Sequence, residues 1–256
     1  MKLNIKVALL NLVLFVLLFS CTKDSSSTTF NPSTGKSGST ARMIVVGDYM
    51  YVVDNQNLKT FDISTPNNPI SRSSIEVGFG IETIFPFANY LFIGSTDGMY
   101  IYNINNPAIP VLASTGRVDH FRSCDPVVAN SNYAYVTLNT LNTECGNSII
   151  VNELQIVDIH DVLHPQVINQ MQLLGPKGLG LAGSNLFICD KDLGVLVFDL
   201  TDPEIPSIID TLTGFTANDL IPDNGNLLVV CNDGLRQFDY SNINNISLTS
   251  YLDIND

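Results

Sequence analysis

The chain has no tryptophan, only 3 histidines and few basic residues among its 256 residues. Its 12 Lys and Arg stand against 25 Asp and Glu, which gives a formal net charge of −13 at pH 7. Binding of DNA or RNA needs a basic face that displaces counterions, so nucleic acid is not an expected partner. The sequence also lacks Cys-x-x-Cys pairs, histidine pairs at ligand spacing, a Gly-x-Ser-x-Gly elbow and a phosphate-binding glycine loop, and so carries no zinc, serine-hydrolase or nucleotide signature.

The first 20 residues have the features of an export signal. Lys2 and Lys6 accompany an apolar run, Val7 to Phe19, that is too short to span a bilayer comfortably. The run ends in Leu18-Phe19-Ser20-Cys21, which resembles a bacterial lipobox, where the cysteine is lipidated and becomes the N-terminus. We therefore predict a signal peptide over residues 1–20 and lipidation of Cys21. The alternative is an ordinary signal peptide followed by a chance cysteine.

Residues 21–41 are predicted to form a flexible linker behind the lipidated cysteine. Thr22 to Ala41 is rich in Ser, Thr and Gly and has almost no large apolar side chain with which to offset the entropy of ordering. Thr22-Lys23-Asp24 resembles the Lys-acid signal that sends some Bacteroidetes lipoproteins to the cell surface. We expect an outer-membrane lipoprotein that touches the membrane through its acyl chains alone. Whether it faces outward or the periplasm stays open.

The rest of the chain, residues 42–256, is a repeat. A signature of the form Phe-Asp-Ile recurs with its central residue at Asp62, Asn103, Asp158, Asp199 and Asp239, at spacings of 41, 55, 41 and 40 residues. Each unit has an apolar stretch, a polar turn, a β-rich strand, a second turn, the signature strand, a proline-containing turn in all but the last unit, and an outer strand. Four short antiparallel strands at a period near 40 residues are typical of a propeller blade.

We therefore predict an all-β fold, a five-bladed β-propeller of four-stranded antiparallel blades. In a closed ring every blade has two partner blades. The alternative is an open arc or a larger ring built from two chains. Leu196-Val197-Phe198-Asp199-Leu200 and the proline turn after it, with their copies, resemble the LVIVD repeat of bacterial secreted proteins. That resemblance implies a propeller-like fold with surface or extracellular placement, and it implies no established reaction.

Two pairs of cysteines remain in the repeat region. An oxidising compartment permits pairing. Cys124 opens the third unit and Cys145 lies in its enlarged second turn, on one face of an up-and-down blade, so we predict a Cys124–Cys145 disulfide worth about 3 kcal/mol by loop entropy. The alternative is two free thiols. Cys189 and Cys231 lie in apolar strands and are expected in the core.

A candidate site follows from aligning the five units on the residue expected to open the second strand, which is Asp48, Asn89, Asn132, Asn185 or Asn226. Seven residues earlier this alignment places Ala41, Glu82, Asp125, Gly178 and Asp219. In a closed ring these positions meet at the mouth of the central channel, with His120, Arg122 and Lys177 nearby. Such carboxylates could bind a hard cation such as Ca²⁺ or serve acid/base chemistry, and the plain alternative is that they are solvated.

The leading functional hypothesis is a non-enzymatic binding module of the cell envelope, displayed by the lipid anchor, with the insertion-bearing face (Leu138–Asn152) contacting an envelope protein or glycan. No catalytic residue is assigned. The rival hypothesis is a hydrolase or lyase that acts through Glu82, Asp125 and Asp219, and a purely structural envelope role is a third.

Overall fold

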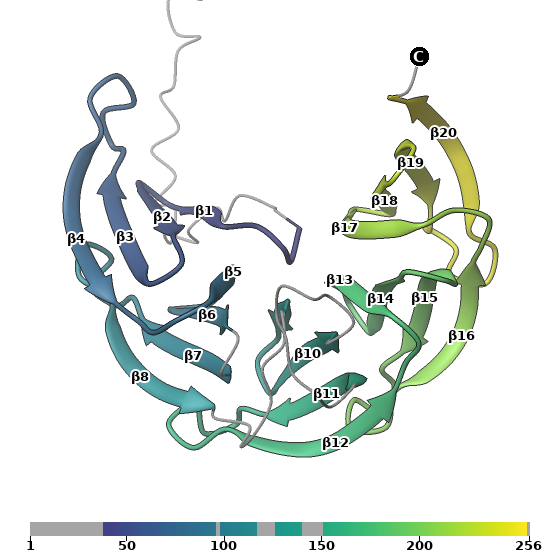
Figure 1. The fold of residues 1–256 in the computed structure, drawn as a ribbon, viewed down its shortest axis with the longest axis horizontal. Coiled ribbons are helices and arrows are strands. Elements are labelled where there is room, and N and C mark those ends of the chain that lie inside the picture. The colour runs from purple at the N-terminus through teal and green to yellow at the C-terminus, as the bar shows by residue number, and fades with distance from the viewer. Residues whose placement is uncertain (1–37, 96–97, 117–125, 140–150, 255–256) are drawn as a thin grey trace, which may run out of the picture. The chain divides into compact units, whose positions relative to one another are not determined.

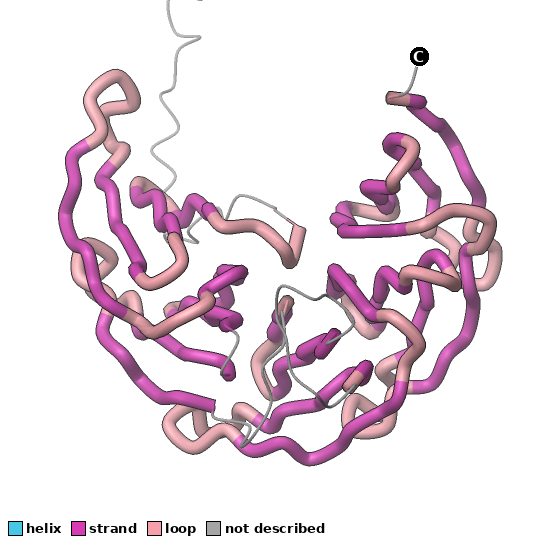
Figure 2. Tube along the Cα trace, viewed as in Figure 1, coloured by secondary structure: helices cyan, strands magenta, loops and turns pink. Residues whose placement is uncertain are grey.

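The computed structural model describes residues 38–95, 98–116, 126–139 and 151–254. The chain divides into two compact units, Met1–Pro32 and Ser33–Asp256, and all described residues belong to the second. Their regular structure consists of strands alone (Figure 2). In these ranges no helix is long and apolar enough to cross a membrane.

Twenty strands form five four-stranded antiparallel sheets, here called blades 1 to 5 in chain order (Figure 1). The inner strands are β1 (Met43–Val46), β5 (Ile81–Phe87), β9 (Val127–Ala129), β13 (Pro176–Ala182) and β17 (Ala217–Asp223). The second strands are β2 (Tyr49–Val53), β6 (Tyr90–Ser95), β10 (Tyr133–Asn139), β14 (Asn185–Asp190) and β18 (Asn226–Cys231). The third strands are β3 (Asn57–Asp62), β7 (Gly98–Asn103), β11 (Asn152–Asp158), β15 (Gly194–Asp199) and β19 (Gly234–Asp239). The outer strands are β4 (Ile70–Glu76), β8 (Val111–Gly116), β12 (Gln166–Gln172), β16 (Ser207–Leu212) and β20 (Ser247–Asp253).

The predicted fold class is confirmed, with four strands per repeat unit in the expected order. In blades 2 and 5 the third strand begins with the glycine of an Asp-Gly pair in the sequence. Gly98 and Gly234 open the third strands with φ of 139° and 151°, a backbone conformation that side chains with a Cβ rarely adopt. A Cβ on Gly234 would also lie 2.0 Å from the carbonyl oxygen of Leu252 on the outer strand, so that position requires glycine for space as well.

The repeat signature has a definite structural role at the end of each third strand. Its central side chain accepts a hydrogen bond from the backbone amide two residues later. The Ser64 amide donates to Asp62 Oδ1 at 3.0 Å and the Thr201 amide donates to Asp199 Oδ1 at 2.9 Å. In all five blades the pairing of the third and fourth strands also shifts register just before the signature, which indicates a β-bulge. The signature Asp or Asn therefore ends the strand and begins the loop to the outer strand.

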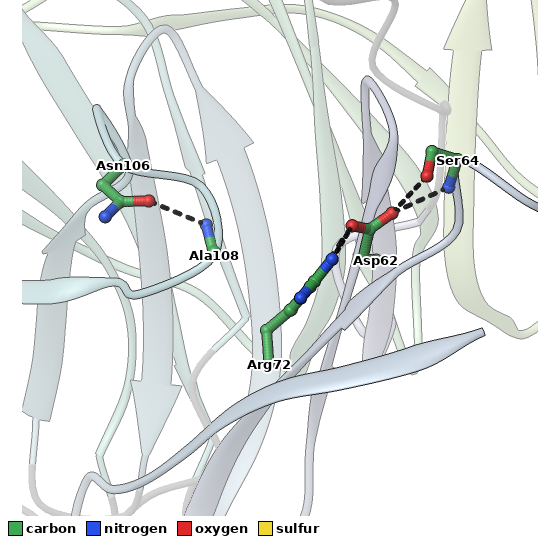
Figure 3. Close-up of polar contacts among 5 residues, drawn as sticks. All are labelled: Asp62, Ser64, Arg72, Asn106 and Ala108. Atoms are coloured by element: carbon green, nitrogen blue, oxygen red, sulfur yellow. Dashed lines mark hydrogen bonds and ion pairs between the residues drawn. The ribbon is translucent and has the colours of Figure 1, made fainter.

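Blade 1 shows this turn in its most elaborate form (Figure 3). Besides the amide and hydroxyl of Ser64, Asp62 accepts hydrogen bonds at Oδ2 from Arg72 Nη2, at 2.6 Å, and Nε, at 3.2 Å. The Ser64 and Arg72 hydrogen bonds lower the pKa of Asp62 to about 2. A second turn of the same type, in which Asn106 accepts the Ala108 amide at 3.3 Å, follows within the loop of blade 2. Short polar side chains thus fix loops that have little apolar surface to bury.

Apolar cores lie between successive blades. The described residues form four such clusters, which join blades 1 and 2, 2 and 3, 3 and 4, and 4 and 5. Consequently the second strands of blades 2, 3 and 4 are buried on both faces, whereas β18 alternates strictly between exposed and buried residues. Among the described residues no fifth core joins blade 5 to blade 1. The two end blades therefore differ from the expectation that every blade packs between two others.

Candidate functional site

The segment Gly38–Arg42, here called the strap, precedes β1 and is bonded to inner strands of several blades. On one side it joins blades 1 and 2. The Val53 amide of β2 donates to the carbonyl oxygen of Arg42 at 2.9 Å, and the Ile84 amide of β5 donates to the carbonyl oxygen of Ala41 at 3.0 Å. These bonds set the strap against the beginnings of the inner strands.

On its other side the strap reaches blades 4 and 5. The Leu179 amide of β13 donates to Ser39 Oγ at 2.7 Å, and Ser39 is only 1% exposed. Thr40 Oγ1 donates to Asp219 Oδ2 of β17 at 2.6 Å, and Ser39 Oγ lies 3.3 Å from Asp219 Oδ1. A segment of five residues therefore contacts four of the five blades, and its partner Asp219 lies about 180 positions away in the chain. Composition assigns residues 38–41 to the linker, and the structure places them among the inner strands.

Asp219 is the polar centre of this arrangement. Burial raises the pKa of its carboxyl group above the ordinary value, and the hydrogen bonds from Thr40 and Ser39 act in the opposite direction. Both carboxylate oxygens already have a hydroxyl partner from the strap. This carboxylate therefore works as an attachment point for the strap.

Two glycines let the backbone pass close to that carboxylate. A Cβ on Gly38 would lie 1.9 Å from Asp219 Oδ2, and a Cβ on Gly178 of β13 would lie 2.2 Å from Asp219 Oδ1. Real Cβ atoms do not approach so closely, so any larger residue at either position must displace the strap or the strand. In the strap, Gly38 is thus required because a larger residue does not fit, and Ser39 supplies hydrogen bonds.

The predicted residue Lys177 lies in the same region. Its Nζ donates to Asn218 Oδ1 at 2.5 Å, and Asn218 in turn donates through Nδ2 to Asn232 Oδ1 at 2.8 Å. Thr137 Oγ1 of β10 donates to the Lys177 carbonyl oxygen at 2.6 Å. This polar chain links blades 3, 4 and 5 beside the strap.

The predicted alignment of the acidic residues needs a correction by one position. Asn185 and Asn226 begin their second strands, but in blade 2 the second strand begins at Tyr90, one residue after Asn89. Strand pairing therefore makes Thr83, and not Glu82, equivalent to Gly178 and Asp219. Glu82 shares its register with Lys177 and Asn218, in the irregular part of each inner strand where one extra residue is inserted. Glu82 and Asp219 therefore do not occupy equivalent positions.

Several predictions fall outside the described residues: Cys21, His120, Arg122, Cys124, Asp125 and Cys145. The lipidated cysteine and the disulfide stay predictions. For the suggested Ca²⁺ site, no group of three or more His, Cys, Asp or Glu residues suited to a metal ion occurs in the described part of the chain. Asp219, a described acid of this proposed site, is held by the strap.

Cys189 and Cys231 are confirmed as core residues. Both are free and buried in the cluster between blades 4 and 5, and burial raises the pKa of each thiol. The residues that sequence reasoning missed are Ser39 and Thr40. Their only signal is a hydroxyl pair followed by Ala41 and the first apolar stretch, which is the same pattern as the linker before them.

Comparison with known proteins agrees with this architecture. The LVIVD repeat family matches residues 37–76, which cover the strap and blade 1. No curated protein matches the sequence.

Solved structures that resemble the chain have low sequence identity. A protein of unknown function from Desulfotomaculum acetoxidans has a TM-score of 0.62 at 13% identity, over 80% of this chain and 68% of that one. Apo AztD from Citrobacter koseri has a TM-score of 0.58 at 13% identity, over 85% of this chain and 60% of that one. A hypothetical selenium-binding protein from Sulfolobus tokodaii has a TM-score of 0.58 at 14% identity, over 81% and 59%. At this identity the likeness shows the fold alone. The chain carries an LVIVD repeat within a propeller-like fold of five four-stranded blades.

Proposed function

We propose that this protein is a lipid-anchored interaction module of the bacterial cell envelope, held in the outer membrane through Cys21 and a linker. The observation that carries the proposal is the strap. The linker leads into a segment whose hydroxyl and backbone groups bond to four blades at the inner strands. A chain attached there holds four of the five blades together at one end of a tether, which suits a rigid module displayed on a membrane.

The binding face in this proposal is the end of the blades that carries the second turns. Because neighbouring strands are antiparallel, the start of each inner strand and the turn between its second and third strands lie at the same end of a blade. Asn139 of β10 and Asn152 of β11, which flank the long insertion of the sequence, pair with each other at this end. Loops carried on a rigid scaffold are where binding residues concentrate, so we assign the contact with an envelope protein or glycan to this face.

Catalysis at the channel mouth receives less support. A hydrolase or lyase using Asp219 needs that carboxylate free to exchange a proton with a substrate. In this structure Thr40 and Ser39 donate to both of its oxygens.

The net charge of −13 is consistent with contact to the membrane through the lipid anchor rather than through binding of anionic headgroups by the domain.

Anchoring is tested by metabolic labelling with an alkyne fatty acid in the native host. The wild-type chain is expected to take up the label and to appear in outer-membrane fractions, because the cysteine after the signal peptide is the acylated residue. Cys21→Ala is expected to lose the label entirely. Cys189→Ala, which changes a buried thiol, is the matched control and should keep it. Label on Cys21→Ala would contradict the proposal.

The binding face is tested by shortening the insertion. Replacement of residues 140–150 by a two-residue Asn-Gly turn keeps β10 and β11 joined as a hairpin. We expect this variant to lose co-sedimentation with envelopes from a strain that lacks the protein, with an unchanged melting temperature. The control is a two-residue insertion in the opposite loop at Asn67-Asn68, which should bind as the wild type does. Equal binding by both variants would assign recognition to another face.

A further inference from the structure

The two end blades expose the faces that interior blades use to pack against one another. In blade 4 the face toward blade 5 includes the buried residues Phe187, Cys189, Val195 and Leu212 of the shared core. Strand pairing places Leu228, Val230, Leu235 and Leu252 at the same positions of blade 5. We call these four residues the leading face of blade 5.

The leading face is apolar and uncovered. Leu228, Val230 and Leu252 are 38%, 39% and 60% exposed, whereas their counterparts in blade 4 are almost fully buried. One counterpart is polar: Gln237, which pairs with Leu228, occupies the position that the buried Val197 has in blade 4. Covering this aliphatic surface with a partner would stabilise the complex by about 25 cal/mol for each Å² removed from water.

Blade 1 exposes the complementary side. In blade 2 the face toward blade 1 includes the buried residues Ile84, Leu91, Ile93 and Tyr102. Their counterparts by register in blade 1 are Met43, Met50, Val52 and Phe61, here called the trailing face. Met43 is 54% exposed and the other three are partly buried.

The four existing cores show how these two kinds of face meet. In each of them the leading face of one blade packs on the trailing face of the next. Blade 5 thus has an unpaired leading face and blade 1 an unpaired trailing face, and among the described residues these two blades share no apolar core.

We propose that the leading face of blade 5 docks on the trailing face of blade 1 in a second copy of this chain. The contact repeats the blade-to-blade interface that is already present four times within each copy. A second copy is the occupant we choose because its blade 1 has a trailing face of the kind that packs on a leading face in those interfaces. Such a head-to-tail contact is heterologous, so it closes into a ring or extends as a filament according to its rotation. This inference stands on the blade faces and does not depend on the lipid anchor or on the proposed envelope ligand.

Two blocked variants of the full-length chain test the proposal. Leu228→Glu with Val230→Glu blocks the leading face, and Met43→Glu with Val52→Glu blocks the trailing face. Each variant alone is expected to be monomeric by light scattering in detergent, whereas the wild type associates as its concentration rises. Mixed together, the two variants are expected to form a one-to-one dimer, because each supplies the face that the other lacks. Ile209→Glu, an exposed position on β16, is the control and should associate like the wild type.

The mixture is also tested by co-purification through a tag on one variant. Tagged leading-blocked chain should retain trailing-blocked chain but should not retain untagged leading-blocked chain, which controls for shared micelles. Association of the trailing-blocked variant with itself would indicate a symmetric pairing of leading faces and overturn the proposal. A wild type that stays monomeric at about 100 μM, well above the dissociation constant of a micromolar contact, would also overturn it. If a glutamate pair prevents cooperative melting, threonine replaces it, because threonine suits strands and still removes most of the apolar contact.

Discussion

Truncation of Phe187 to alanine is expected to lower the free energy of unfolding by roughly 3–5 kcal/mol, because it leaves a cavity in a close-packed core. The phenyl ring is fully buried between blades 4 and 5 and packs against the Tyr240 ring with centroids 5.1 Å apart. The measurement is urea denaturation followed by tyrosine fluorescence, with a check that the m-value is unchanged.

Leu228→Ala is the matched control for this experiment. Leu228 occupies the same register position in blade 5 as Phe187 does in blade 4, but it is 38% exposed. Its loss should cost about 1 kcal/mol or less in dilute monomer. If Leu228→Ala destabilised the dilute monomer as much as Phe187→Ala does, the leading face of blade 5 would have to be covered within the same chain.

Gly38→Ala is expected to destabilise the fold by about 1–3 kcal/mol, because its Cβ would overlap the Asp219 carboxylate and push the strap from its place. The displaced strap would lose the Thr40–Asp219 and Ser39–Leu179 hydrogen bonds. In an Asp219→Ala background the overlapping atoms are gone, so adding Gly38→Ala should cost little more. The double-mutant cycle should then give a coupling energy of about 1–3 kcal/mol.

Gly178→Ala separates this effect from general crowding. A Cβ there would meet the Asp219 carboxylate, but it would also lie 2.8 Å from Asp219 Cα and 2.9 Å from the Asn218 carbonyl oxygen. Removal of the carboxylate cannot relieve the contacts with the backbone, so Asp219→Ala should not rescue Gly178→Ala. Free energies from urea titration, together with the rate of proteolysis ahead of β1, provide the readout. Additive costs for Gly38→Ala and Asp219→Ala would mean that the strap does not dock on this carboxylate.

The repeat made most of the fold predictable from sequence. The outer strand Ser207–Leu212 and the second strand Asn226–Cys231 are examples, because apolar residues between glycine and proline turns leave few other structures. The signature Asp was recognisable as a marker, and its role in the turn follows from the preference of short polar side chains for neighbouring amides.

The strap could not be predicted in the same way. Its contacts use two hydroxyl groups and main-chain atoms, with almost no apolar burial, and its partner Asp219 is about 180 residues away. A Ser- and Thr-rich segment of this kind has the composition of a disordered linker. Only the arrangement of the inner strands brings its partners together.

The misplacement of Glu82 has a local cause. The inner strands of blades 2, 4 and 5 contain an irregular position near their start, and counting back from Asn89 adds a further shift of one residue. A one-residue shift in a strand moves a side chain to the opposite face.

The exposed faces of blades 1 and 5 could not be predicted from the sequence for a different reason. Leu228 and Met43 continue the apolar pattern of the interior blades, and that pattern does not record whether a neighbouring blade is present.

The position of the strap also determines the order in which the domain resists a pulling force. Tension applied to the chain ahead of residue 38 first loads the side-chain bonds of Ser39 and Thr40 to blades 4 and 5. It reaches the backbone ladder of β1 and β2 only after those bonds have yielded. The hydroxyl groups of Ser39 and Thr40 therefore bear the load first, and blade 1 unfolds only after their hydrogen bonds have broken.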